Sequence, residues 1–195
     1  MLSYRRSVGR TFGGTRRSMH MTLEPGLIQV YTGNGKGKTT AALGLALRAA
    51  GQGLQVVVIQ FMKGWPHYGE LVSVQLLPHV TLHQYGRPDF VDRNKPHAED
   101  IRQASEALQH ARQIVASGQV DLLILDEVNV AVDYGLLDLA DLLELLEAKP
   151  EHMELVLTGR AAHPEVMKRA DLVTEMLDIK HPFDSGVAAR QGIEY

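Results

Sequence analysis

The stretch "GNGKGKTT", residues 33–40, most constrains what this chain can fold into. An apolar run typical of a buried β-strand precedes it (residues 27–32), and the sequence "AALGLALRAAGQG", typical of a helix, follows it. Glycines let backbone N–H groups turn towards phosphate oxygens, and the positive end of the helix and the Lys38 ammonium both favour bound negative charge. The sequence therefore predicts a phosphate-binding turn between a strand and a helix.

This turn is a variant of the phosphate-loop (P-loop) pattern G-x-x-x-x-G-K-[ST]. Counting back from Gly37-Lys38-Thr39 places Thr32 where the pattern has its first glycine, so Gly33 and Gly35 supply the flexibility instead. A purely structural turn rich in glycine and lysine is the alternative. If the turn were only structural, the strand–loop–helix context, the "GKT" triplet and a downstream "LLILDE" strand would have to occur together by chance.

Two carboxylates follow the apolar residues of that downstream strand. Asp126 and Glu127 end a buried run, where an unpaired carboxylate is costly and a bound cation makes it tolerable. The Thr39 hydroxyl is a further oxygen ligand at the loop. We therefore expect these three residues to hold Mg²⁺ or Mn²⁺, and ATP to be the phosphorylated partner.

The residues alone leave the reaction open. A kinase or ATPase needs a base or a water-positioning residue near the terminal phosphate, and Glu127 could serve. A guanine-specific GTPase is disfavoured, because "NKPH" at residues 94–97 has histidine where an N/T-K-x-D element has aspartate. The residues alone therefore predict a Mg·ATP-dependent enzyme but do not identify the reaction.

Composition limits the class of protein. The chain has 195 residues, 45% of them hydrophobic, and no cysteine, which fits one globular domain without disulfides or thiolate metal sites. Its apolar runs are too short for a membrane span. Residues 1–20 carry five arginines and no acid, which leaves the rest with 15 basic and 23 acidic residues, a charge of −8. We expect a soluble, cytoplasmic protein that binds neither nucleic acid nor membrane.

The basic segment, residues 1–24, is expected to be an arm outside the catalytic domain, residues 25–195. Its composition fits a disordered or mis-started tail, because "MTLEPGLIQVYTG" from Met21 makes a natural beginning. A functional arm near the active site and a targeting segment are the alternatives, since the stretch has arginines and serines, no acid and no continuous apolar core.

Apolar strands alternate with helical patterns along the rest of the chain, which predicts an α/β fold with a mainly parallel sheet and helices on both faces. The helix of the P-loop unit is expected at residues 39–50, and further helices at 97–117, 135–148 and 164–169. Strands are expected at residues 54–61 and 121–127, and at the segments "VTLHQYG", "ELVLTGR" and "DLVTEML". The first of these three segments is interpreted as an edge strand. Ligands of such sheets bind beyond the carboxyl ends of the strands, where the glycine loop, the acid pair and "TGR" would emerge.

Other polar patterns are given structural interpretations. An acidic residue recurs every third position on the 135–148 helix (Asp138, Asp141, Glu144, Glu147), which indicates a solvated face rather than a metal site. His79 and His83 are four apart on a loop and a strand, where that spacing does not converge on zinc. His181 is interpreted as structural.

Six segments together resemble the ATP:corrinoid adenosyltransferases, or cob(I)alamin adenosyltransferases, of the P-loop class. They are "TGNGKGKTTAALG", "VIQFMKG", "LLILDEVNVAVDYGLL", "LVLTGR", "ADLVTEM" and "KHPFDSGVAARQGIEY". The similarity runs from Leu27 to Tyr195. The C-terminal segment "KHPFDSGVAARQGIEY" and the segment "LDEVNVAVDYG" are far more specific to this family than a P-loop is. The resemblance implies a single P-loop NTPase-like domain.

The resemblance also implies a reaction. The family transfers the 5′-deoxyadenosyl group of ATP to the Co(I) ion of a reduced corrinoid and releases triphosphate, in adenosylcobalamin synthesis or corrinoid salvage. Cobalt is the nucleophile, so the protein needs neither a nucleophile nor a base of its own. A reduced flavoprotein is the implied electron donor, and a homodimer the implied assembly. A phosphoryl-transferring kinase or ATPase, and a nucleotide- or corrinoid-binding chaperone without turnover, remain the competing hypotheses.

The resemblance implies roles for individual residues. Lys38, Thr39 and Glu127 are expected to be catalytic, by neutralising charge that develops on the triphosphate. The expected ATP contacts are Gly33, Asn34, Gly35, Lys36, Gly37, Lys38, Thr39, Thr40 and Arg160, and the expected corrinoid contacts are Phe90 and Trp65. Many family members carry a G-F-T-W element where this chain has "GRPDFVDRNKPH", so the corrinoid contacts have the weaker support.

Overall fold

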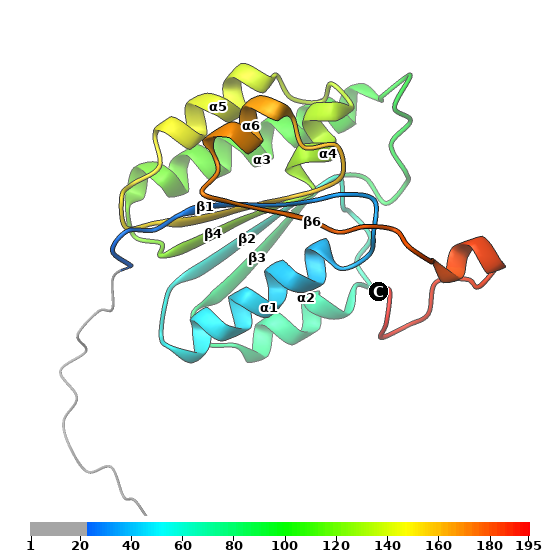
Figure 1. The fold of residues 1–195 in the computed structure, drawn as a ribbon, viewed down its shortest axis with the longest axis horizontal. Helices are drawn as coiled ribbons and strands as arrows, with labels where there is room; N and C mark the ends of the chain where they lie inside the picture. The colour runs from blue at the N-terminus through cyan, green and yellow to red at the C-terminus, as the bar shows by residue number, and fades with distance from the viewer. Residues whose placement is uncertain (1–22) are drawn as a thin grey trace, which may run out of the picture.

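A computed structural model describes residues 23–195 as an α/β fold built on one six-stranded parallel sheet, in the order β3-β2-β4-β5-β1-β6 (Figure 1). The strands are β1 (Ile28–Thr32), β2 (Val56–Phe61), β3 (Val80–Tyr85), β4 (Leu122–Asp126), β5 (Glu154–Thr158) and β6 (Leu172–Glu175). Every strand pairing is parallel, which confirms the predicted fold class. The predictions for the basic arm concern residues that lie largely outside the described ones.

Helices cover both faces of the sheet (Figure 1). They are α1 (Lys38–Gly51), α2 (Gly69–Ser73), α3 (Ala98–Ser117), α4 (Val128–Asp133), α5 (Leu139–Glu147) and α6 (Pro164–Arg169), with short 3₁₀ turns η1 (Val74–Leu76) and η2 (Pro182–Ser185). One face packs against α3, α4, α5 and α6, and the other against α1 and the η1 region. All five residues of β4 are buried, because a central parallel strand is covered on both sides.

Helices α1 and α3 each bury one face against the sheet. Helix α1 buries alanines against it at Ala42, Ala46, Ala49 and Ala50. Helix α3 buries Ala104, Leu108, Ala111 and Val115, which are spaced three or four residues apart, although Ile101 is exposed. The helix lies between Pro96 and Gly118. His97 caps its N-terminus, and Gly118 at φ 61° ends it in a left-handed conformation.

The predicted helix at residues 135–148 begins later than expected. Gly135 adopts φ 69° and Asp138 is the extended N-cap residue, so the helix runs from Leu139 to Glu147 as α5. A separate short helix, α4, which was not predicted, precedes it. The acidic row on α5 also forms surface ion pairs, because Arg112 lies 2.6 Å from Asp141.

The sheet edges differ in cover. Strand β3 is an edge strand, as predicted, and packs beneath α3. Strand β6, at the other edge, is exposed along all four residues. Within residues 23–195, no helix combines the length and the hydrophobicity needed to cross a membrane.

Candidate active site

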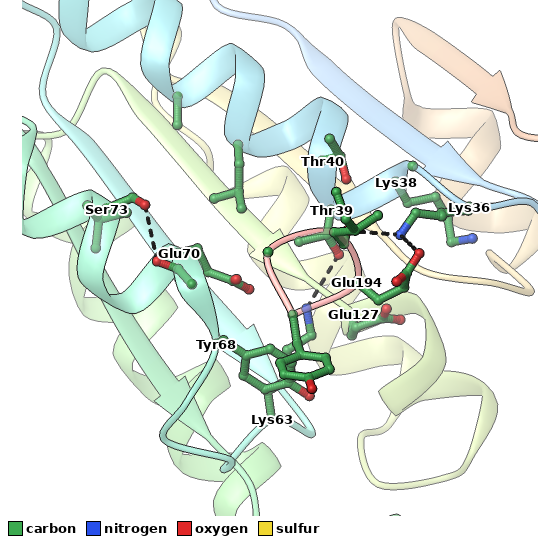
Figure 2. A pocket seen from close by; sticks show the side chains of 18 of the residues that line it. Lys36, Lys38, Thr39, Thr40, Lys63, Tyr68, Glu70, Ser73, Glu127 and Glu194 are labelled. Carbon is green, nitrogen blue, oxygen red and sulfur yellow. Dashed lines mark hydrogen bonds and ion pairs between the residues drawn. The ribbon is translucent and has the colours of Figure 1, made fainter. Parts of the chain in front are cut away.

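A cavity of about 830 Å³ opens at the carboxyl edge of the sheet (Figure 2). The P-loop and the first turns of α1 form one wall, and the segment from Lys63 to Leu77 forms another. Residues from the C-terminal tail complete it: His181, Gly192, Ile193, Glu194 and Tyr195. Because all strands are parallel, the residues that follow β1, β2, β4 and β5 reach this one place.

The glycines of the loop accommodate the chain that leaves β6. A Cβ atom on Gly35 would lie 2.4 Å from the Leu177 carbonyl oxygen, and one on Gly33 would lie 2.4 Å from that of Met176. The Gly35 N–H donates to the Met176 carbonyl at 2.7 Å. Glycine at these two positions is therefore required by the close approach of the tail, a packing reason that the P-loop pattern did not indicate.

Lys38 points back into its own loop. Its ammonium donates to the carbonyl oxygens of Gly33 and Gly35, both at 2.7 Å. Burial lowers the pKa of Lys38, and nearby Arg160 lowers it further, against the opposing effect of Glu127. The loop thus holds a buried positive charge at the polar end of the cavity.

Asp126 is the centre of a hydrogen-bond network beneath the loop. Its Oδ1 accepts from the Thr39 hydroxyl at 2.9 Å and from the Thr158 hydroxyl at 2.6 Å. Its Oδ2 accepts from Lys63 at 2.7 Å and from Gln60 at 3.2 Å. Burial opposes ionisation of Asp126, but Lys63 and the two hydroxyls outweigh it, so the pKa of Asp126 lies below its ordinary value.

Glu127 lies beside Asp126 and lines the cavity. Its backbone is left-handed at φ 65°, and its N–H donates to the Thr158 hydroxyl at 3.0 Å. Burial and the charge of Asp126 raise the pKa of Glu127. A cation near both carboxylates would favour their ionised forms.

The structure brings most of the predicted nucleotide-binding residues to this cavity. Those that line it are Gly35, Lys36, Gly37, Lys38, Thr39, Thr40, Glu127 and Arg160. Asn34 is exposed and Gly33 is buried, and neither lines the cavity.

Neither of the two predicted corrinoid residues lines the cavity. The Trp65 ring meets those of Tyr195 and Tyr68 edge to face, at centroid distances of 5.0 and 5.4 Å, and both tyrosines line the cavity. Phe90 is fully exposed on the loop before α3 and does not line it. A corrinoid role for Trp65 or Phe90 stays a prediction.

Sequence reasoning missed Lys63 and the C-terminal tail as parts of the site. Lys63 is the second residue after a buried strand, in "VIQFMKG", so its place at the carboxyl edge of the sheet could have been inferred. The tail could not be placed in this way, because no periodicity connects Tyr195 with the P-loop. Figure 2 shows Lys36 of the loop next to Glu194 of the tail, with their charged atoms 3.6 Å apart.

The histidines have local roles. His79 Nδ1 lies 2.9 Å from the Gln55 amide, and the His83 ring packs against that of His110. His181 Nδ1 accepts from the Phe183 N–H at 3.2 Å, which caps the turn η2. In the part of the chain that the structure describes, no three His, Cys, Asp or Glu residues cluster in a way that could hold a metal ion.

Comparison with known proteins agrees with this geometry. Residues 24–195 match the family described as ATP:corrinoid adenosyltransferase BtuR/CobO/CobP. The corrinoid adenosyltransferase of Escherichia coli K12 and the corrinoid adenosyltransferase CobA of Salmonella typhimurium are each 40% identical over 173 residues, 88% of this chain and 87% of theirs. The Pseudomonas aeruginosa corrinoid adenosyltransferase is 39% identical over 88% of this chain and 85% of its own. The chain therefore belongs to the ATP:corrinoid adenosyltransferase family.

Proposed function

We propose that this chain transfers the 5′-deoxyadenosyl group of ATP to the Co(I) ion of a reduced corrinoid and releases triphosphate. The single observation that carries the proposal is the convergence of Lys38, Thr39 and Glu127 at one end of a large cavity, with Asp126 hydrogen-bonded to Thr39 beneath it. That end suits a polyphosphate leaving group. Leu43, Leu47 and Leu77 line another part of the cavity and offer apolar surface to less polar parts of the substrates.

The protein contributes positioning and charge. Cobalt supplies the electron pair that attacks C5′ of the ribose, and the bond between C5′ and its oxygen breaks, so the electrons leave with the triphosphate. Lys38 would neutralise the charge that develops there, because a preorganised buried cation costs no solvent reorganisation. Holding C5′ in line with cobalt is the remaining task.

Thr39, Asp126 and Glu127 suit a divalent cation. Their ligand atoms are all oxygens, which Mg²⁺ and Mn²⁺ prefer, and a cation would relieve the repulsion between the buried Asp126 carboxylate and its half-buried neighbour Glu127. When bound, such an ion would neutralise charge on the triphosphate. Removal of the divalent cation with a chelator is therefore expected to abolish turnover, and its readdition to restore it.

We also propose that the active form is a homodimer and that a reduced flavoprotein delivers the electron to cobalt. Support for the dimer comes from apolar side chains that are exposed on β6 and in the tail: Leu172, Val173, Leu177, Ile179 and Phe183. Large exposed apolar side chains at an unpaired sheet edge and in the segment after it offer a surface that a second copy of the chain could cover. The flavoprotein follows from family membership alone, and cytoplasmic location stays a prediction.

The decisive experiment is to mix the full chain with Mg·ATP and chemically reduced cobalamin and to identify both products. We expect adenosylcobalamin, followed by its absorption spectrum and mass, together with inorganic triphosphate in equal amount. ADP or orthophosphate as the main product, with no cobalt–carbon bond, would indicate phosphoryl transfer. Tight binding of both substrates without either product would indicate a carrier.

A further inference from the structure

Lys63 is a half-buried cation at the site whose role the proposed reaction does not yet use. It follows β2 on a backbone turned by Met62, which adopts φ 58°. Its own N–H donates to the Tyr85 carbonyl at 3.3 Å. The next residue is tightly packed, since a Cβ atom on Gly64 would lie 2.1 Å from the Gly86 carbonyl oxygen. The base of the side chain is thus fixed, and only its flexible stem can redirect the charge.

The ammonium of Lys63 lies between the acid network and the cavity. It is 2.7 Å from Asp126 Oδ2, 3.4 Å from the Thr39 hydroxyl and 5.7 Å from the centroid of the Tyr68 ring. Its side chain is 16% exposed, and Lys63 itself lines the cavity. Figure 2 shows it directed at Thr39, next to Tyr68. A ligand that reaches the Thr39 hydroxyl therefore comes close to this charge.

Asp126 keeps its position without Lys63. Three neutral donors hold the carboxylate: the hydroxyls of Thr39 and Thr158 on Oδ1 and the Gln60 amide on Oδ2. Gln60 is itself fully buried, so this donor cannot move into solvent. The ammonium is therefore able to turn away without displacing the carboxylate.

We propose that Lys63 is a second polyphosphate-binding lysine, which exchanges its ion pair with Asp126 for the phosphate chain of bound ATP. The inference rests on the proposed function and adds a residue to its substrate contacts. A phosphate chain at Lys38 and Thr39 places several negative charges within reach of Lys63, whereas Asp126 offers only one. Lys63 then binds the triphosphate from the side opposite the glycine loop and holds it as it leaves.

The test is the affinity of the full chain for three probes with Mg²⁺, measured by titration calorimetry: ATP, inorganic triphosphate and adenosine. Loss of one charge-assisted contact lowers affinity by about ten- to a hundredfold. For Lys63→Met we expect that loss for ATP and inorganic triphosphate, and less than about a twofold change for adenosine, which has no phosphate. Unchanged triphosphate affinity would overturn the inference, and so would an equal loss for adenosine.

Lys63→Gln guards against misfolding, because its amide can still donate to Asp126 while the charge is lost. It is expected to weaken triphosphate binding as Lys63→Met does, and Lys63→Arg to retain most of it. The matched control is Lys168→Met on α6, an exposed lysine outside the cavity, which should bind all probes like the wild type. Wild-type triphosphate affinity in Lys63→Gln would show that Lys63 only pairs with Asp126 and does not bind phosphate.

The two proposals fail in different ways. A wild-type chain that binds triphosphate and forms adenosylcobalamin, with Lys63 variants that bind triphosphate equally well, refutes only the role of Lys63. A wild-type chain that forms no adenosylcobalamin refutes the proposed function. A wild-type chain without measurable affinity for triphosphate refutes the inference as well.

Discussion

The Thr158 hydroxyl connects the backbone of Glu127 with the carboxylate of Asp126 through a single atom. It accepts from the Glu127 N–H at 3.0 Å and donates to Asp126 Oδ1 at 2.6 Å, and its residue is fully buried. Because a buried polar group without a partner is costly, this hydroxyl stabilises both the turn after β4 and the charge of Asp126.

Thr158→Val should therefore destabilise the protein although it keeps the size and shape of the side chain. Two hydrogen bonds are lost and the Glu127 N–H is left without its partner, which costs about 1–3 kcal/mol of unfolding free energy. Urea denaturation followed by circular dichroism measures this change. Thr81→Val on the exposed side of β3 is the control and should change stability by less than about 0.5 kcal/mol. Equal stability of the two variants would contradict the structural role of Thr158.

Lys38→Ala should separate chemistry from folding. The change removes a charge-assisted contact worth about 1.5–3 kcal/mol, so the rate of adenosylcobalamin formation from Co(I) should fall roughly tenfold to a hundredfold or more. The melting temperature measured on the same sample shows whether the fold is kept. Lys95→Ala, on the exposed loop before α3, should retain the wild-type rate. Full turnover by Lys38→Ala would mean that the loop does not grip the leaving group.

At the scale of elements, the N-terminus of α3 depends on one ion pair, between the buried Asp100 and the partly exposed Arg87. Asp100 Oδ1 accepts from Arg87 at 2.8 Å, and Oδ2 accepts from the His97 N–H at 3.0 Å. Burial opposes ionisation of Asp100, but the Arg87 and His97 hydrogen bonds outweigh it and hold its pKa below the ordinary 3.8. The ionised form therefore stabilises the fold at neutral pH, and protonation removes that contribution.

Asp100→Asn should lower the unfolding free energy at pH 7 by about 1–3 kcal/mol, through loss of charge-assisted hydrogen bonds. Because the folded pKa lies below the unfolded one, the stability of the wild type falls as the pH drops below about 4. The difference between wild type and variant should shrink over that range. Denaturant titrations at several pH values check this, and a difference independent of pH would show that ionisation of Asp100 is not the source of the stability.

The contact between the P-loop and the tail is a second feature at this scale. Gly35→Ala should push the chain after β6 off the loop, because its Cβ atom would lie 2.4 Å from the Leu177 carbonyl oxygen. We expect faster cleavage of residues 177–195 in limited proteolysis. Gly44→Ala on α1, where a Cβ atom meets nothing within 4 Å, is the matched control and should stabilise the helix by about 0.5–1 kcal/mol. Unchanged cleavage in Gly35→Ala would mean that the loop and tail can separate without strain.

For the whole molecule, the exposed edge at β6 is the surface to which we assign the proposed dimer contact. Val173→Glu places a charge on this apolar edge, so we expect a lower dimer fraction in light scattering coupled to size-exclusion chromatography. Leu76→Glu, on the exposed turn η1 elsewhere, should leave the dimer unchanged. A chain that is monomeric before any change would contradict the proposed assembly.

Local sequence patterns were sufficient for the parallel α/β fold and for the loop between β1 and α1. Buried strands and amphipathic helices have characteristic periods, and a parallel sheet brings the ends of its strands to one edge, so Lys38, Thr39 and Asp126 could be placed near one another in advance. The start of α5 could not, because Gly135 and Asp138 interrupt a leucine pattern that by itself continues as a helix.

Only the tertiary structure decided which distant residues complete the cavity. The ion pair of Lys63 with Asp126, the packing of Trp65 against Tyr195 and the approach of Leu177 to Gly35 join segments that no periodicity relates. Such contacts depend on the crossing of loops and on where the last strand leaves the sheet. Those are properties of the packed chain, whereas a motif reports only the backbone conformation and chemistry of its own residues.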